Sequence, residues 1–120
     1  MRTLTALERT AVLALAAEIA SDDERNQLVE DLAHCKVDVL SHGARLMFHI
    51  EGYERPRYRG QDTFRGRDGF PVEGTVLDQD GTVIDVALYS DQNNRVLELE
   101  LVKHSAVAIP IADWTTFRLK

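Results

Sequence analysis

Only one cysteine occurs among the 120 residues, which excludes an intramolecular disulfide. Cys35 follows a helical pattern at a position where a small apolar residue would pack, and a lone thiol favours a reducing compartment. Long apolar runs are also missing, because the most apolar segment is interrupted by three charged residues, Glu8, Arg9 and Glu18. Such a segment fits neither a signal peptide nor a membrane helix of about 20 residues. We therefore expect a cytoplasmic protein that does not enter the membrane.

Basic residues are few relative to acidic ones, 14 against 20, and the net charge of −6 opposes general attraction to nucleic acid or anionic lipid. The four histidines show no metal-binding spacing, and we find no phosphate-binding glycine motif and no serine elbow. The stretch Asp78-Gln-Asp-Gly81 resembles the start of a calcium loop but lacks the later ligands, so a hairpin turn explains it better. We expect no metal, no cofactor and no catalytic residue, and we predict that the chain is not an enzyme.

Two helices are predicted near the N-terminus. Thr5 to Glu8 and Ser21 to Glu24 each have the spacing of a capping box, in which a hydroxyl and a carboxylate satisfy the first free amides of a helix. Apolar residues follow each box at helical spacing, up to about residue 34. In the second helix Leu28, Leu32 and Cys35 form the apolar stripe, while the opposite face is expected to carry Arg25, Glu30 and Asp31.

The apolar period changes from helical to twofold after Cys35, which predicts a hairpin over residues 37–50. Further strands are predicted at 72–77, 82–89 and 95–103, separated by turns rich in Asp, Asn and Gly. A last extended stretch carries three anchors that should dock on the body, Trp114, Phe117 and Leu119. The predicted fold is a single α+β domain, residues 1–120, with two N-terminal helices packed on an antiparallel meander of about five strands.

The segment 53–70 is the most unusual part of the sequence, because it holds five arginines against three acids and four interleaved aromatic residues. Arginine forks and aromatic rings bind phosphates, carboxylates and protein hot spots. A partner-binding role is therefore assigned to Arg55, Arg57, Tyr58, Arg59, Phe64, Arg65 and Arg67. Three interpretations stay open: a protein interface, a nucleotide or RNA site, and a structural loop whose arginines pair with acids of the same fold.

A second candidate site lies on the strand 96–102. Its leucines at 97, 99 and 101 alternate with two glutamates, which predicts a buried leucine face and a solvent-exposed face carrying Glu98 and Glu100. Asp85 of a neighbouring strand is expected to join the glutamates. An exposed acidic sheet face without a special role is the commonest explanation of such a group, an acidic protein-binding face comes next, and a metal site or acid–base pair comes last.

Two motifs resemble those of small uncharacterised bacterial α+β proteins: a helix starting with Leu4-Thr-Ala-Leu-Glu-Arg9, and a sheet closed by Leu97-Glu-Leu-Glu-Leu101. Proteins of this size and architecture often serve as immunity proteins against bacterial toxins. The resemblance implies a protein-binding role and transfers no catalytic residue. It leads to the hypothesis of a cytoplasmic immunity protein that binds a toxin-like partner, with a regulatory nucleotide or RNA binder as the alternative. A homo-oligomer is compatible with both.

Overall fold

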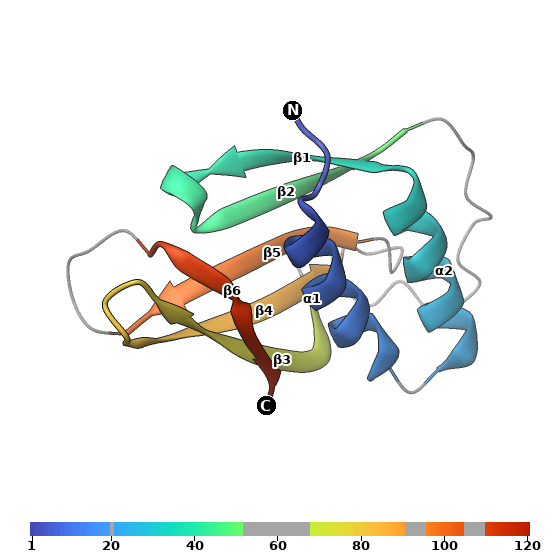
Figure 1. The fold of residues 1–120 in the computed structure, drawn as a ribbon. Helices are drawn as coiled ribbons and strands as arrows, with labels where there is room; N and C mark the ends of the chain where they lie inside the picture. The colour runs from blue at the N-terminus through green and yellow to red at the C-terminus, as the bar shows by residue number, and fades with distance from the viewer. Residues whose placement is uncertain (20, 52–67, 91–95, 105–109) are drawn as a thin grey trace.

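The computed structural model describes residues 1–19, 21–51, 68–90, 96–104 and 110–120, which form an α+β fold of two helices and a six-stranded antiparallel sheet (Figure 1). The elements along the chain are α1 (Ala6–Ala17), α2 (Asp22–Ala33), β1 (Cys35–Leu40), a short 3-10 turn (Ser41–Gly43), β2 (Arg45–Ile50), β3 (Asp68–Asp78), β4 (Val83–Ser90), β5 (Val96–Lys103) and β6 (Ala112–Leu119). The predicted fold class is therefore confirmed.

Both helices begin at the predicted caps. At α1 the Thr5 hydroxyl accepts a hydrogen bond from the Glu8 amide at 3.2 Å, and the Glu8 carboxylate accepts one from the Thr5 amide at 2.8 Å, which completes the capping box. At α2 the Ser21 hydroxyl accepts from the Glu24 amide at 3.3 Å. The N-cap hydrogen bond of the second predicted capping box is therefore present.

The order of strands in the sheet differs from a simple meander. It is β1-β2-β5-β4-β3-β6, with every neighbouring pair antiparallel. Only β3, β4 and β5 follow one another as a meander, while the β1–β2 hairpin pairs with β5 and the extra strand β6 pairs with β3. The prediction of about five strands in series was wrong on this point because alternation identifies a strand but does not identify its neighbours.

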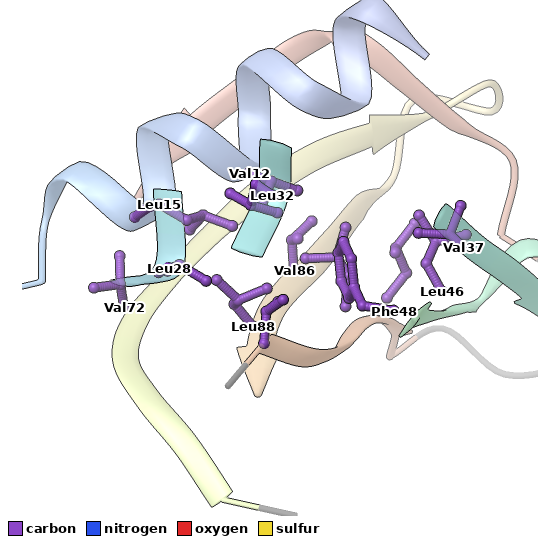
Figure 2. Close-up of a cluster of buried hydrophobic side chains, with 14 of the residues drawn as sticks. Val12, Leu15, Leu28, Leu32, Val37, Leu46, Phe48, Val72, Val86 and Leu88 are labelled. Carbon is purple, nitrogen blue, oxygen red and sulfur yellow. The ribbon is translucent and has the colours of Figure 1, made fainter. Parts of the chain in front are cut away.

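The core lies between the helices and one face of the sheet, which we call the inner face (Figure 2). Side chains of both helices and of strands β1 to β5 share one buried cluster, which includes Val12, Leu15, Leu28, Leu32, Val37, Leu46, Phe48, Val72, Val86 and Leu88. The opposite side of the sheet is the outer face. Because side chains alternate along a strand, the residues on either side of each core residue belong to the outer face.

An irregularity in β5 changes which apolar residues reach the core. Leu99 and Leu101 are buried on the inner face, as predicted. Leu97 is only partly buried, because Tyr89 lies opposite Glu98 and the next residue of β4, Ser90, lies opposite Val96. Leu97 is therefore the extra residue of a β-bulge, and Val96 takes the core position that the alternation had assigned to Leu97.

Asp31 in α2 is fully buried, which corrects the prediction that it faces outward. Its carboxylate accepts a hydrogen bond from the backbone amide of Val96 at 3.4 Å. The helix therefore supplies an acceptor for an amide at the start of β5, and a polar residue occupies a position on its packed side.

Candidate functional site

Of the two candidate sites predicted from the sequence, the structure describes one. The arginines and aromatics assigned to the first site lie outside the described residues: Arg55, Arg57, Tyr58, Arg59, Phe64, Arg65 and Arg67. The three acids of the second site, Asp85, Glu98 and Glu100, are described and come from the neighbouring strands β4 and β5. The described residues therefore contain the second site and not the first.

Register places these three acids on the outer face. Glu98 lies opposite Tyr89 and Glu100 opposite Ala87, while Asp85 lies opposite Val102. Partners in an antiparallel pair point to the same side of the sheet, so the acids share a side that neither of the described helices covers. The predicted grouping of the acids is therefore present in the fold.

Glu98 is buried, not exposed, which corrects the prediction of a solvent-facing pair of glutamates. Its side chain is 2% exposed and accepts a hydrogen bond from Arg45 Nε at 2.7 Å, in a salt bridge between strands β2 and β5. Tyr89 on one neighbouring strand and Met47 on the other lie directly opposite it. A central strand flanked by large side chains removes a carboxylate from water, and a buried carboxylate requires such a partner.

Arg45 had no distinguishing signal in the sequence, because its pairing depends on β2 lying beside β5. Its own side chain remains 40% exposed, and Glu100 lies directly opposite it. The guanidinium therefore connects the buried carboxylate of Glu98 to the surface of the outer face.

Asp85 forms the second charged group of the outer face. One of its carboxylate oxygens lies 2.6 Å from His104 Nε2 and the other lies 3.2 Å from Lys120 Nζ. The hydrogen bond with His104, aided by Lys120, lowers the pKa of Asp85. Lys120 also reaches Glu73 at 3.3 Å, and its bonds to Asp85 and Glu73 raise the pKa of its ammonium. The face is consequently a mosaic of paired charges, not a uniformly acidic surface.

Three exposed apolar side chains adjoin these charges. Leu77 of β3 and Val83 of β4 lie opposite each other and are 40% and 54% exposed. Val102 of β5, 37% exposed, lies opposite Asp85, so it is the diagonal neighbour of Val83. We call Leu77, Val83 and Val102 the apolar triad. The triad was not predicted from the sequence, although Val83 and Val102 both alternate with core residues along their strands.

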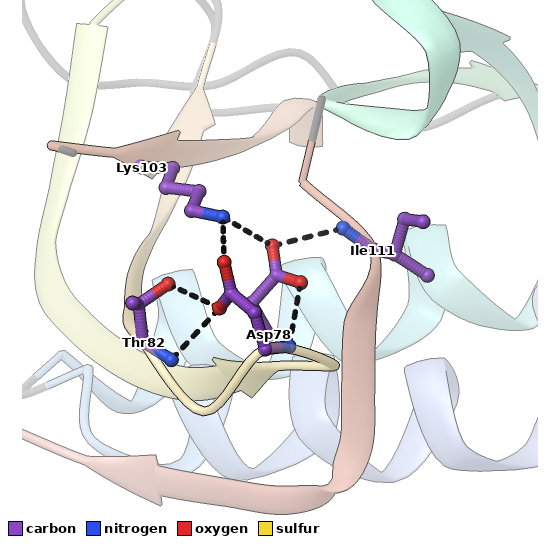
Figure 3. A network of polar contacts seen from close by, with 5 residues as sticks. Asp78, Thr82, Lys103 and Ile111 are labelled. Atoms are coloured by element: carbon purple, nitrogen blue, oxygen red, sulfur yellow. Dashed lines mark hydrogen bonds and ion pairs between the residues drawn. The ribbon is translucent and has the colours of Figure 1, made fainter. Parts of the chain in front are cut away.

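A separate polar network fixes the turn between β3 and β4 (Figure 3). The Lys103 ammonium, on a side chain that is 5% exposed, lies 3.2 Å from Asp78 and 2.7 Å from Asp80. Asp78 also accepts the Ile111 amide at 3.2 Å, and Asp80 accepts both the amide and the hydroxyl of Thr82. The Asp78-Gln-Asp-Gly81 stretch is the predicted hairpin turn, and a lysine of the protein neutralises its two carboxylates.

Other chemistry-bearing groups do not assemble into a site in the described residues. Among them, no group of three or more histidine, cysteine, aspartate and glutamate side chains could hold a metal ion. Cys35 is half-buried, and burial raises the pKa of its thiol, which donates to the Leu32 carbonyl at 3.4 Å. No helix in the described ranges is long and apolar enough to cross a membrane.

Comparisons with known proteins place the chain in a family. Neither the curated proteins nor the solved structures gave a match to this sequence. One family model, described as a domain of unknown function, DUF6984, matches residues 1–109, which include both helices and strands β1 to β5. The chain therefore belongs to the DUF6984 family.

Proposed function

We propose that this protein is a non-catalytic protein-binding module, of the immunity-protein type, that neutralises a bacterial toxin by binding it with the outer face of the sheet. The observation that carries the proposal is the apolar triad, Leu77, Val83 and Val102, exposed beside paired charges on the side away from the helices. Apolar centres bordered by polar groups are typical of protein interfaces, since the centre supplies affinity and the border supplies specificity.

The charges indicate what kind of partner this face would bind. Asp85 lies two residues from Val83 in β4, and Glu100 lies two residues from Val102 in β5. The whole chain carries a net charge of −6. Such a field attracts a cationic partner and accelerates its association. Because Asp85 is held by His104 and Lys120, its carboxylate is positioned before any partner arrives. A basic toxin, such as a nuclease, fits this combination.

The test uses the protein encoded by the gene directly upstream of this one as the probe, with binding measured by calorimetry. Val83→Asp places a charge in the centre of the triad and should weaken binding at least tenfold, on the order of 1.4 kcal/mol or more. Val29→Asp is the matched control, because Val29 is 44% exposed on α2, away from the outer face. This control should bind like the wild type, and both variants should keep the wild-type melting temperature within a few degrees.

The outcomes separate the parts of the proposal. An upstream product that does not bind, and whose toxicity this protein does not relieve in cells, would exclude the immunity role. Binding that survives Val83→Asp but is lost in Val29→Asp would exclude the outer face as the interface.

The alternative function is regulatory binding of a nucleotide or RNA through the segment 53–70, favoured by its five arginines and its aromatic residues. It predicts salt-sensitive binding of single-stranded RNA that the double substitution Arg57→Ala, Arg59→Ala weakens with little change in melting temperature. RNA binding that depends on these arginines, together with no effect of Val83→Asp, would favour the alternative over the immunity role.

A further inference from the structure

The last strand, β6, contributes less to the buried core than any other strand. None of its residues, Ala112–Leu119, is buried, and no β6 residue belongs to the set of buried side chains that forms the core. Of its predicted anchors, Trp114 and Phe117 pack against the margin of the core, while Leu119 is 41% exposed. Segments with few buried apolar groups open at a lower free energy than the core does.

Pairing between β6 and β3 is also interrupted. Leu119 and Arg118 pair with the middle of β3, at Gly74 and Thr75, and Asp113 and Ala112 pair with its last two residues, but the four residues between them bulge opposite Val76. In the bulge, the Leu77 amide donates to the Thr116 hydroxyl at 2.7 Å. A pocket of about 460 Å³ remains at this place, lined by residues 75–77 and 115–118. Strand β6 therefore has an incomplete ladder.

The contacts that hold the two ends of β6 are polar. Asp78 accepts the amide of Ile111, just before the strand, at 3.2 Å. At the other end Lys120 bridges Glu73 and Asp85, with a side chain that is 47% exposed. Exposed ion pairs are weak and are screened by salt, so the side-chain contacts of Lys120 add little to the backbone hydrogen bond that its amide donates to the Glu73 carbonyl at 3.0 Å.

Gly74 of β3 forms a seat for an aromatic ring of β6. A Cβ at residue 74 would lie 2.6 Å from Cε2 of Phe117 and 2.8 Å from the Arg118 carbonyl oxygen, closer than real Cβ contacts. Its three nearest atoms all belong to β6. A side chain at this position would therefore displace β6 before it disturbed the rest of the fold.

The family boundary falls just before this strand. The DUF6984 match ends at residue 109, and β6 begins at Ala112. Without β6, strand β3 would become an edge with unpaired amides and carbonyls, which is the kind of edge that recruits another strand. At the opposite edge of the sheet, Arg2 already pairs with Val37 of β1.

We propose that β6 is a displaceable strand, which opens separately from the rest of the molecule, and that the vacated edge of β3 accepts an extended segment of a partner polypeptide. The acceptor site has three parts: the Gly74 seat for an aromatic ring, the Asp78 carboxylate for a backbone amide, and Glu73 with Asp85 for a cationic side chain. It takes a strand with an aromatic residue followed, about three residues later, by a lysine or arginine. This site lies on the sheet edge and shares Asp85 with the proposed toxin-binding face, but its tests use a peptide and not the toxin, so the two proposals can fail separately.

Hydrogen exchange of the full chain tests the opening. Amides of β6 should exchange at least tenfold faster than those of β4 and β5, and salt should increase the difference. Exchange of β6 at the same rate as β4 and β5 would overturn the proposal, because it would mean that β6 is lost only on global unfolding.

Peptide binding tests the acceptor edge. The probe is a fluorescein-labelled peptide with the sequence of residues 110–120, added to full-length variants. Phe117→Ala empties the seat, so this variant should bind the peptide at least tenfold more tightly than the wild type does. Adding Gly74→Ala to the same variant fills the seat and should abolish the gain. A peptide that carries alanine in place of its own phenylalanine should also fail to bind.

The control for folding is Lys120→Gln, which removes only exposed ion pairs of β6. If Phe117→Ala lowers the melting temperature of the whole molecule, the peptide is added to the Lys120→Gln variant instead. This variant should bind the peptide more tightly than the wild type does at the same salt concentration. Peptide binding that is no tighter in the opened variant than in the wild type would overturn the acceptor site.

Discussion

The carboxylate of Asp31 in α2 accepts a hydrogen bond from the backbone amide of Val96, the first residue of β5. The two residues are far apart in sequence, and both are buried. This bond ties the helical layer to a central strand of the sheet at the place where that strand begins. It also fixes the core residue that comes just before the bulge at Leu97.

Replacing Asp31 with alanine leaves the Val96 amide buried without this acceptor. We expect the free energy of unfolding to fall by about 1–3 kcal/mol, the usual cost of an unsatisfied buried polar group. Glu30→Ala is the matched control, since Glu30 neighbours Asp31 but its side chain is 62% exposed, and it should change stability by less than about 0.5 kcal/mol. Urea denaturation of both variants measures the difference, and equal stabilities would show that the bond is dispensable.

Leu99 and Val102 of β5 offer a comparison between the two faces of one strand. Leu99 is fully buried in the core, so Leu99→Ala should destabilise the protein by roughly 2–5 kcal/mol through lost burial and a cavity. Val102 is exposed on the outer face, and Val102→Ala should cost less than about 1 kcal/mol. Chemical denaturation distinguishes them, and a larger effect for Val102 would contradict the assignment of the faces.

The salt bridge between Arg45 and Glu98 should be worth more than a surface pair. Because the Glu98 side chain is almost fully buried, Arg45→Met removes a close partner of a carboxylate that has little access to water. A double-mutant cycle with Glu98→Gln should give a coupling energy of about 1–3 kcal/mol. The measurement is again unfolding by urea. A coupling near zero would mean that the two residues are neighbours without a stabilising interaction.

Much of the fold follows from local patterns in the sequence. Thr5 and Ser21 mark the helix starts because their hydroxyls satisfy free helix amides, and twofold alternation marks the strands. Both signals are local. The partner of each strand depends on long-range pairing, and so the position of β2 beside β5 could not be predicted from them. The burial of Glu98 follows from that pairing, because it depends on Arg45 and Met47 being its neighbours.

The candidate site was predicted in part for the same reason. Parity along β5 placed Glu98 and Glu100 together on one face, and Asp85 joins them as expected. Alternation did not show that His104 and Lys120 would pair with Asp85, since they approach it from different strand ends. The triad was overlooked because exposed valines and leucines look like core residues until the register is known.

Lys103 should control how stability depends on pH. The hydrogen bond that Lys103 donates to Asp80 is the main cause of the lowered pKa of Asp80, and hydrogen bonds from Thr82 lower it further. The hydrogen bond between Lys103 and Asp80 also raises the pKa of Lys103. Lys103→Met removes the cation and keeps a long apolar stem. We expect this variant to be less stable than the wild type at neutral pH, by an amount that urea denaturation measures.

The sign of the pH dependence follows from the direction of each shift. A carboxyl with a lowered pKa stabilises the fold above its unfolded value of about 4, and this contribution is lost as the pH falls through the lowered pKa. A lysine with a raised pKa stabilises the fold below about 10.4, and its contribution is lost as the pH rises through the raised pKa. The difference between wild type and Lys103→Met should therefore be largest from about pH 5 to 9 and shrink toward both extremes. Lys36→Met, at an exposed position of β1, should follow the wild-type curve throughout, and a Lys103→Met deficit that stays constant from about pH 3 to 11 would show that lost packing, not charge, causes it.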